Sequence, residues 1–495
     1  MEVAPRVSLA AQRMNAPPPV SAAARPSAES QSAFLPVHLL YRVGIIALYA
    51  VVLLTIVLNV EVNRKSPAFI LLCLAQILNF AVILFPVIFY KPSFGWFHPL
   101  FFYTCQYLLF QFRSYATYLQ GISHHRALPE YSVEDIVLLV AFALTLHAVS
   151  TLAYYFGFWF GPNLKVPRVG FRQPRRLSLK AMAAVVFSVG VFWFYVERAG
   201  GLGQHLLSWQ TGRHEALAGD YYWILLIKVS AMACLLWFTL NRRAVYQPLF
   251  WVCSVVSVLI NFLATGSRST VVVFFIVAML VWMLRERKFA PARIIGIGLL
   301  GVVLISFLGG FRSRLWRGEI SLASEGEETT LVEYFEQGAI ESAERAWTNS
   351  GLLPILARVP DDVDMLYGSS YFALLTLPIP RSVWPDKPGQ VGGLVGDVFF
   401  HSPAGTPPGP IGEAYWNFHV PGVVIIFFIF GTFQKWLAQT FVRYQRQPAA
   451  VLVYLTVLFT IDPSTPAVVV CLMLVVPLLI LLRLVGALSF KVKNA

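Results

Sequence analysis

The chain has 495 residues, of which 57% are apolar and only 13% are charged, about half of the usual charged share of about 25%. Its mean hydropathy is +0.66. A water-soluble globule has too little interior for so much apolar surface, so the composition excludes soluble enzymes and disordered or fibrous proteins. It predicts an all-α polytopic integral membrane protein.

The formal net charge is +13. The basic residues stand mainly between apolar runs, where they orient spanning helices and contact anionic lipid headgroups. This placement favours a lipid bilayer as the partner and excludes nucleic acid.

Residues 1–37 are rich in Ala, Pro and Ser and predict a disordered tail. Apolar runs long enough to cross a bilayer follow, and they predict about twelve spanning helices. The expected spans are 38–60, 67–90, 97–112, 136–160, 179–197, 222–240, 246–264, 270–284, 293–309, 420–440, 449–461 and 466–487. They divide into a first bundle of about nine helices (38–309) and a last group of about three (420–487), before a short tail (488–495).

Basic clusters give the orientation. Clusters within 165–176, 242–243, 285–293, 443–446 and 491–493 all fall on one side if the spans alternate. The positive-inside rule places that side in the cytoplasm, together with both termini.

Residues 310–419 then form a large external loop. Eleven of the chain's 25 acidic residues lie between Glu319 and Asp364. Within the loop, 330–349 has the pattern of an amphipathic helix. A second apolar piece, Tyr371–Leu377, is too short to span and is expected to pack on the bundle or at the interface.

Arginines near the external surface are the candidate anion-binding residues. Arg213 lies in the loop after the fifth span, and the turn between the seventh and eighth spans reads Thr265-Gly-Ser-Arg268-Ser-Thr270. An arginine so close to the bilayer is costly unless it meets an anion or water. It can instead snorkel from a helix end, and the residues alone leave both interpretations open.

The external loop adds more cations and a carboxylate. It begins with Arg312 and Arg314, and its segment 378–388 contains four prolines that stiffen the backbone around Arg381, Trp384 and Lys387. It closes with a segment 410–419 that holds Glu413, Asn417 and His419. Glu413 is a candidate general base, or an ion-pair partner of one of these arginines.

Four of these segments resemble the Wzy-type oligosaccharide repeat-unit polymerases of bacterial polysaccharide export, and the resemblance covers residues 40–485. They are the Gly-Gly…Arg213 loop, the Gly266-Ser-Arg268 turn, Pro380-Arg381-Ser-Val-Trp384-Pro-Asp-Lys387-Pro and Gly412-Glu413-Ala-Tyr-Trp-Asn417. The resemblance implies a multi-pass glycosyltransferase of the bacterial inner membrane with a periplasmic active face. It implies no cofactor and no metal.

In the implied reaction, a growing glycan on undecaprenyl diphosphate is the donor and a single lipid-linked repeat unit is the acceptor. An acceptor hydroxyl attacks the anomeric carbon, and undecaprenyl diphosphate leaves. The implied catalytic residues are Glu413, Arg268 and Arg381. The implied diphosphate-binding residues are Arg213, Arg268, Arg312, Arg314, Arg381 and Lys387. The implied glycan-binding residues are Trp384, Asn417 and His419. A chain-length regulator and a flippase of the same pathway are the implied protein partners.

Three other functions fit the same residues. A ligase that transfers O-antigen to the lipid A core shares the architecture and often uses a histidine of the external loop, for which His419 is a candidate. A flippase or other transporter of lipid-linked oligosaccharide would place charges inside the bundle, where Lys228 is the one clear candidate, although a position near the interface fits it as well. The last is a non-catalytic scaffold of an export complex.

Overall fold

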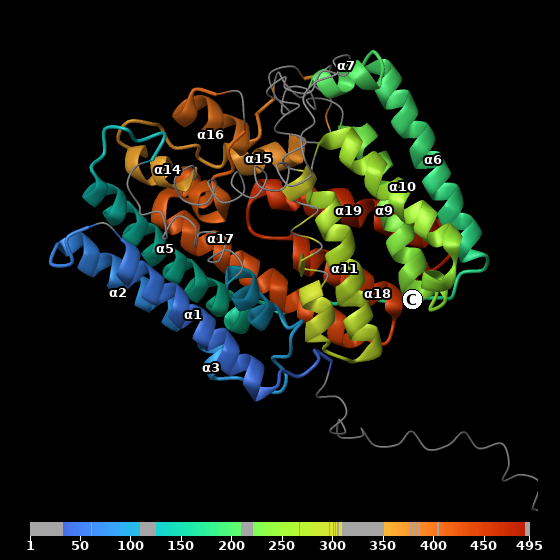
Figure 1. The fold of residues 1–495 in the computed structure, drawn as a ribbon, viewed down its shortest axis with the longest axis horizontal. Coiled ribbons are helices and arrows are strands. Elements are labelled where there is room, and N and C mark those ends of the chain that lie inside the picture. Colours follow the sequence, from blue (N-terminus) through green and yellow to red (C-terminus); the bar gives the residue numbers. More distant parts are fainter. Residues whose placement is uncertain are drawn as a thin grey trace, which may run out of the picture.

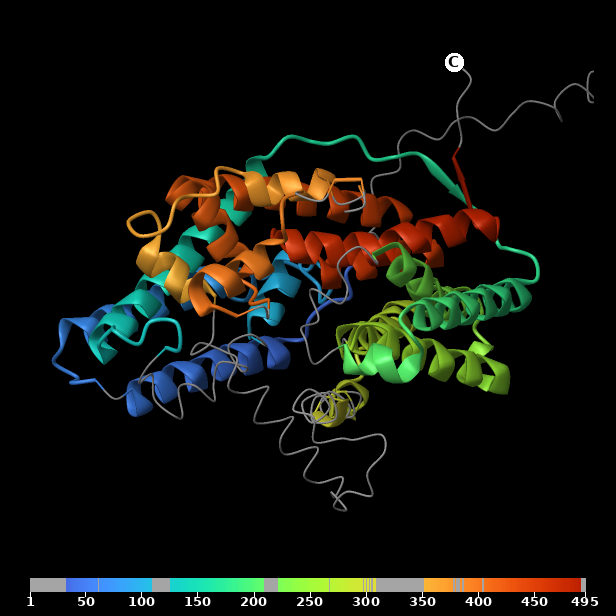
Figure 2. The same ribbon diagram turned by 90° about the horizontal axis from the view of Figure 1, so that it is seen from above.

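The computed structural model is helical, with one pair of short strands in the part of the chain that it describes (Figures 1 and 2). It describes residues 33–60, 62–108, 125–208, 221–266, 268–296, 298–299, 301, 303, 306–308, 351–376, 379, 383–384, 387–402 and 405–490, with only the backbone of 268–270 and 490. The amphipathic helix expected over 330–349 lies outside these residues.

The described elements of the first two thirds of the chain are α1 (Leu39–Asn59), α2 (Pro67–Ile83), α3 (Phe85–Ile88), α5 (Val133–Phe160), β1 (Val169–Phe171), α6 (Leu177–Arg198), α7 (Leu202–Leu207), α9 (Tyr221–Leu240), the 3-10 helix η3 (Ala244–Tyr246), α10 (Pro248–Thr265) and α11 (Arg268–Glu286). Those of the last third are α14 (Leu352–Arg358), α15 (Ser369–Thr376), α16 (Val391–Phe400), α17 (Gly409–Tyr444), α18 (Pro448–Thr460), α19 (Thr465–Leu484) and β2 (Leu488–Phe490). Residues 99–108 are helical as well.

Seven of the described helices are long and apolar enough to cross a membrane, namely α1, α5, α6, α9, α10, α17 and α19. This agrees with an all-α membrane protein. The count of twelve is not confirmed, because α2 and α18 are shorter than eighteen residues and α11 is not among the seven.

Local sequence explains where the helices begin. Ser132 and Asp135 form a capping box at the start of α5, in which each side chain bonds the backbone of the other. Proline stands in the first turn of α2, α10, α18 and α19, where its missing N–H group costs nothing.

The helices form two groups (Figure 1). In one group, α1, α2, α5 and α17 run side by side. In the other, α6, α9, α10 and α11 pack together. Helices α18 and α19 contact each other and α9, and α18 also contacts α17, so this pair joins the two groups. Glycines let α5 and α17 approach closely. A Cβ atom added at Gly431 would lie 2.0 Å from the Tyr154 carbonyl oxygen.

We expect Gly431→Ala to force α5 and α17 apart and to destabilise the protein by about 1–3 kcal/mol, the usual cost of overpacking. Gly190→Ala is the matched control, because a Cβ atom there meets nothing within 4 Å. The measurement is the thermal unfolding midpoint in detergent. Equal midpoints for the two variants would contradict the close packing of α5 and α17.

The bundle has two distinct ends. At the end we call the β end, β1 pairs antiparallel with β2, and the Lys435 ammonium of α17 donates to the Gly161 carbonyl after α5 (2.8 Å). At the end we call the loop end, α14, α15 and the first residues of α17 meet the start of α5 and of α19. Residues 33–37, which the sequence places in the tail, pack at the β end, where the Phe34 ring contacts Phe441 and Tyr454.

Candidate functional site

Glu413 lies at the loop end and is fully buried. One carboxylate oxygen accepts hydrogen bonds from the Thr465 and Ser370 hydroxyls (2.6 and 2.8 Å), and the other accepts from the Thr465 backbone N–H group (2.8 Å). Thr465 is the first residue of α19, so the carboxylate also receives the positive end of that helix. Glu413 thus joins α17, α15 and α19.

Asn417 lies one helical turn after Glu413 and completes this arrangement. Its amide nitrogen donates to the Ser370 hydroxyl (2.8 Å) and to the Glu413 carbonyl (2.7 Å), while its oxygen accepts from the Gly368 N–H group (2.9 Å). Gly368 has φ +89°, a conformation that glycine adopts without strain, and a Cβ atom there would press on the Phe418 ring at 3.0 Å. We call Glu413, Asn417, Ser370, Thr465 and Tyr371 the carboxylate cluster.

Tyr371 is the member of the cluster with an unsatisfied group. Its hydroxyl is buried and has no hydrogen-bond partner within the described ranges. Burial, and the nearby charge of Glu413, raise the pKa of the Tyr371 hydroxyl, so it stays protonated as a donor. An unsatisfied buried donor of this kind needs an explanation, and the oxygen of a bound ligand would supply one.

Asp462 lies beside the cluster, in the connection from α18 to α19, and accepts bonds from the backbone and hydroxyl of Ser464. Burial raises the pKa of this carboxyl. Asp462, Ser370, Thr465 and Tyr371 were not predicted from the sequence as site residues. Asp462 carried a usable signal, because it is the only acidic residue after Glu413 and stands between two apolar runs. The other three are ordinary loop and helix residues with no such signal.

Helix α17 breaks at His419, where φ is +56° and ψ is −152°. Pro421 follows two residues later and cannot donate a helical hydrogen bond. The Tyr415 hydroxyl and the His419 ring nitrogen Nε2 are hydrogen bonded at 2.6 Å. The break separates the segment 409–417, which carries Glu413 and Asn417 of the carboxylate cluster, from the long apolar part of α17.

Four of the five arginines expected to bind diphosphate lie outside the described residues. These four are Arg213, Arg312, Arg314 and Arg381, and Arg268 is placed only as the first backbone residue of α11. Their assigned roles therefore stay predictions.

The described residues that flank three of these loops are hydrogen bonded to one another in pairs. His205 of α7 bonds the Leu263 carbonyl near the end of α10 (2.9 Å), just before the Arg268 turn. Gln390 donates to the Tyr221 hydroxyl at the start of α9 (2.7 Å), directly after the stretch with Arg213. The loops that carry Arg213, Arg268 and Arg381 thus begin or end near one another.

Lys387 and Trp384 belong to the proline-rich segment. The Lys387 ammonium donates to the Ile379 carbonyl (2.7 Å), which draws the two ends of the segment together. Trp384 is 38% exposed. An exposed ring on a stiffened loop is suited to stacking on a sugar, so the expectation for Trp384 stays a prediction.

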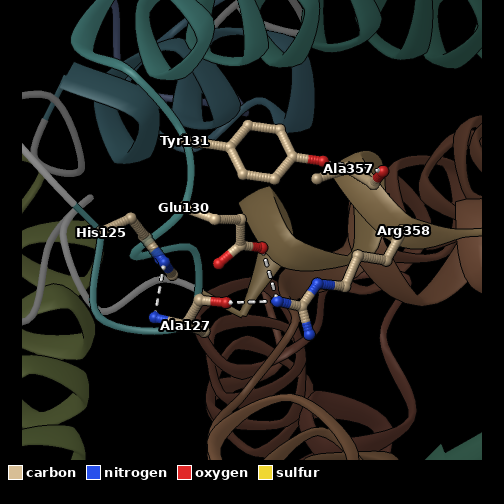
Figure 3. A network of polar contacts seen from close by, with 6 residues as sticks. All are labelled: His125, Ala127, Glu130, Tyr131, Ala357 and Arg358. Carbon is tan, nitrogen blue, oxygen red and sulfur yellow. Dashed lines mark hydrogen bonds and ion pairs between the residues drawn. The ribbon is translucent and has the colours of Figure 1, made fainter. Parts of the chain in front are cut away.

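Helix α14 docks on the residues before α5 (Figure 3). Arg358 donates to the Glu130 carboxylate (2.7 Å) and to the Ala127 carbonyl (3.2 Å), and the Tyr131 hydroxyl lies 3.5 Å from the Ala357 carbonyl. His125 is buried, and its ring nitrogen accepts from the Ala127 N–H group. His125 is therefore part of a folded turn rather than a solvated loop residue.

The Arg358 guanidinium lowers the pKa of Glu130. A lowered pKa in the folded state means that the contact is complete above the ordinary glutamate pKa, about 4.3, and is lost as the pH falls through the lowered value. We expect Arg358→Met to reduce hydrogen-exchange protection of α14 by up to about fivefold at pH 6, a modest effect because the Arg358 and Glu130 side chains are 24% and 52% exposed. The difference from wild type should narrow as the pH falls through the lowered Glu130 pKa, down to the share that the bond to the Ala127 carbonyl keeps. A difference that did not narrow on acidification would contradict the ion pair.

Lys228 is the eighth of the twenty residues of α9, and its side chain is buried. In the described part of the chain, no group of three or more His, Cys, Asp and Glu residues is arranged to hold a metal ion.

Comparison of the chain with known protein families, with curated proteins and with solved structures found no match.

Proposed function

We propose that the protein is a glycosyltransferase of the bacterial inner membrane that polymerises undecaprenyl-diphosphate-linked repeat units on the periplasmic face. The loop end would be that face. In support, the expected cytoplasmic clusters around Arg168, Arg172 and Arg443 all belong to segments at the β end. A chain-length regulator and a flippase would act with it.

One observation carries the proposal. The described flanks of the Arg213, Arg268 and Arg381 segments, on α7, α9, α10 and at the start of α16, contact one another in pairs, and Glu413 lies on α17 at the loop end. A buried carboxylate lies there between three helices. Anionic lipid-linked substrates need such a combination of cationic loops, a carboxylate and neighbouring apolar helices.

The chemistry has two demands. Negative charge grows on the leaving diphosphate, and the planar arginine fork, which pairs two phosphate oxygens, stabilises it. The acceptor hydroxyl loses a proton as it attacks the anomeric carbon, and Glu413 would accept it. Because Glu413 has no exposed surface, α15 must move with its Ser370 hydroxyl before the acceptor can reach the carboxylate. Tyr371 and Asn417 would then bind sugar hydroxyls.

Reconstitution of the purified protein with lipid-linked repeat units tests the proposal. The expected product is a ladder of glycans that differ by one repeat unit. Transfer to a lipid A core without a ladder would identify a ligase instead. Movement of substrate between leaflets without any new glycosidic bond would identify a transporter, for which the buried Lys228 would be the interior cation.

The ligase is the second candidate, and His419 is the observation that favours it. The ring lies at the break in α17, partly exposed and hydrogen bonded to Tyr415, one turn beyond the carboxylate cluster. A histidine held there is positioned to accept a proton. The ligase would be supported if neither the wild type nor His419→Gln polymerised repeat units, and if the wild type transferred glycan to lipid A whereas His419→Gln did not.

A further inference from the structure

A cavity of about 270 Å³ lies at the β end, away from the carboxylate cluster. It is lined by Ala33, by the ends of α9, α11 and α17 with the residues that follow them, and by the first residues of α18. Helix α18 packs against the other three (Figure 1). Four of its twelve lining residues are arginines: Arg242, Arg285, Arg287 and Arg446. Among the residues that the structure describes, no acidic side chain lines it.

The four arginines come from three separate connections. Arg242 follows α9, Arg285 and Arg287 stand at the end of α11, and Arg446 follows α17. Cations near helix ends of this kind complement the negative end of the helix dipole. That accounts for each arginine singly, but not for their convergence around one cavity, where like charges repel.

Arg285 differs from the others. Its guanidinium donates to the Phe238 carbonyl of α9 (3.2 Å) and lies 3.5 Å from the Glu286 carboxylate, and its side chain is only 16% exposed. It therefore fastens α11 to α9. Arg242 and Arg446 are exposed and line the cavity.

Six of the twelve lining residues are apolar, Phe441 and Val451 among them, and Thr239 and Gln445 complete the lining. A small hydrated anion gains nothing from such a wall, whereas an amphiphile does. Basic pockets between spanning helices on the cytoplasmic side are suited to phospholipid headgroups. Helix α18 also begins at the cavity and directs its positive end toward it.

We propose that this cavity binds the phosphate group of an anionic phospholipid, with Arg242 and Arg446 on the phosphate and the apolar wall against the glycerol and upper acyl carbons. The site does not depend on glycosyl transfer. It would act as a lipid contact that holds the ends of α9, α11 and α17 together.

Native mass spectrometry of the protein titrated with dioleoylphosphatidylglycerol tests this site. Each arginine near a membrane surface contributes about fivefold to the affinity for anionic lipid. The double variant Arg242→Gln/Arg446→Gln is therefore expected to bind about twenty-five-fold more weakly, and each single variant about fivefold. The matched control is Arg172→Gln/Arg175→Gln, which removes two exposed arginines of the same end that do not line the cavity.

Two further arms identify the source of the phosphate. Dioleoylphosphatidylcholine, which has no net charge, should bind weakly to all variants. Inorganic phosphate at millimolar concentration should neither displace the lipid nor raise the unfolding midpoint. Saturable binding of inorganic phosphate would overturn the lipid assignment, and equal lipid affinities for the double variant and its control would overturn the site. The single variants keep the test decisive if the double variant does not fold.

Discussion

Glu413→Gln is expected to lower the rate of repeat-unit polymerisation by about 10²–10⁴ while the protein stays folded. The amide has the size of the carboxyl group, and its oxygen can still accept from the Thr465 backbone N–H group. Its nitrogen can donate to the Ser370 and Thr465 hydroxyls, which rotate to accept. The hydrogen bonds are therefore largely kept, whereas the ability to take a proton is lost.

Thr465→Val is the control for a purely structural role of Glu413. It removes the hydroxyl bond to the carboxylate (2.6 Å) but leaves the carboxylate and the backbone bond in place. We expect it to destabilise the protein by about 1 kcal/mol and to change the rate less than tenfold. Rates of ladder formation and thermal midpoints are measured for both variants. If both rates fell only in proportion to lost stability, Glu413 would be a structural residue that ties α17 to α19.

Glu413→Ala separates the two effects further. It leaves the Thr465 N–H group and two hydroxyls without their acceptor in a buried site, at a cost of about 1–3 kcal/mol for each unsatisfied group. We expect this variant to be less stable than Glu413→Gln and no more active. The difference in stability between the two variants measures how firmly the carboxylate cluster holds α15 against α19.

Most helices were predictable because hydropathy reports burial in a bilayer directly. The expected spans 136–160 and 222–240 match α5 and α9 within a few residues. The number of spans was harder to predict, since an apolar run such as 449–461 forms a thirteen-residue helix, α18, that composition alone does not separate from a short span.

The carboxylate cluster was only half predictable. Glu413 and Asn417 stand out because a polar pair four residues apart interrupts an apolar stretch. Their partners come from Ser370 and Thr465, 43 and 52 residues away from Glu413, and pairing at such distances follows from tertiary packing, which no local pattern encodes. The break at His419 likewise follows from packing: Pro421 indicates a bend, and Gly422 permits the approach of Ala414.

Arg268→Ala and Arg381→Ala are each expected to slow polymerisation by about 10²–10³, the usual cost of removing one donor from a developing negative charge. Lysine in either position should restore only part of the rate, because an ammonium group cannot pair two phosphate oxygens at once. Arg175→Ala, an exposed arginine at the β end, is the matched control and should keep the wild-type rate. A scaffold protein would leave polymer length unchanged in all three variants.

The double variant Arg268→Ala/Arg381→Ala tests whether the two loops act on one diphosphate. Groups that stabilise the same leaving charge are strongly non-additive, so the double variant should lose much less than the product of the two single effects. Independent sites would instead multiply. The bond between His205 and Leu263 joins the flank of the Arg213 loop to that of the Arg268 turn. The bond between Gln390 and Tyr221 joins the other flank of the Arg213 loop to the residue that precedes α16, after the Arg381 segment. Full multiplication of the two effects would therefore contradict a shared cleft, even if each single variant were slow.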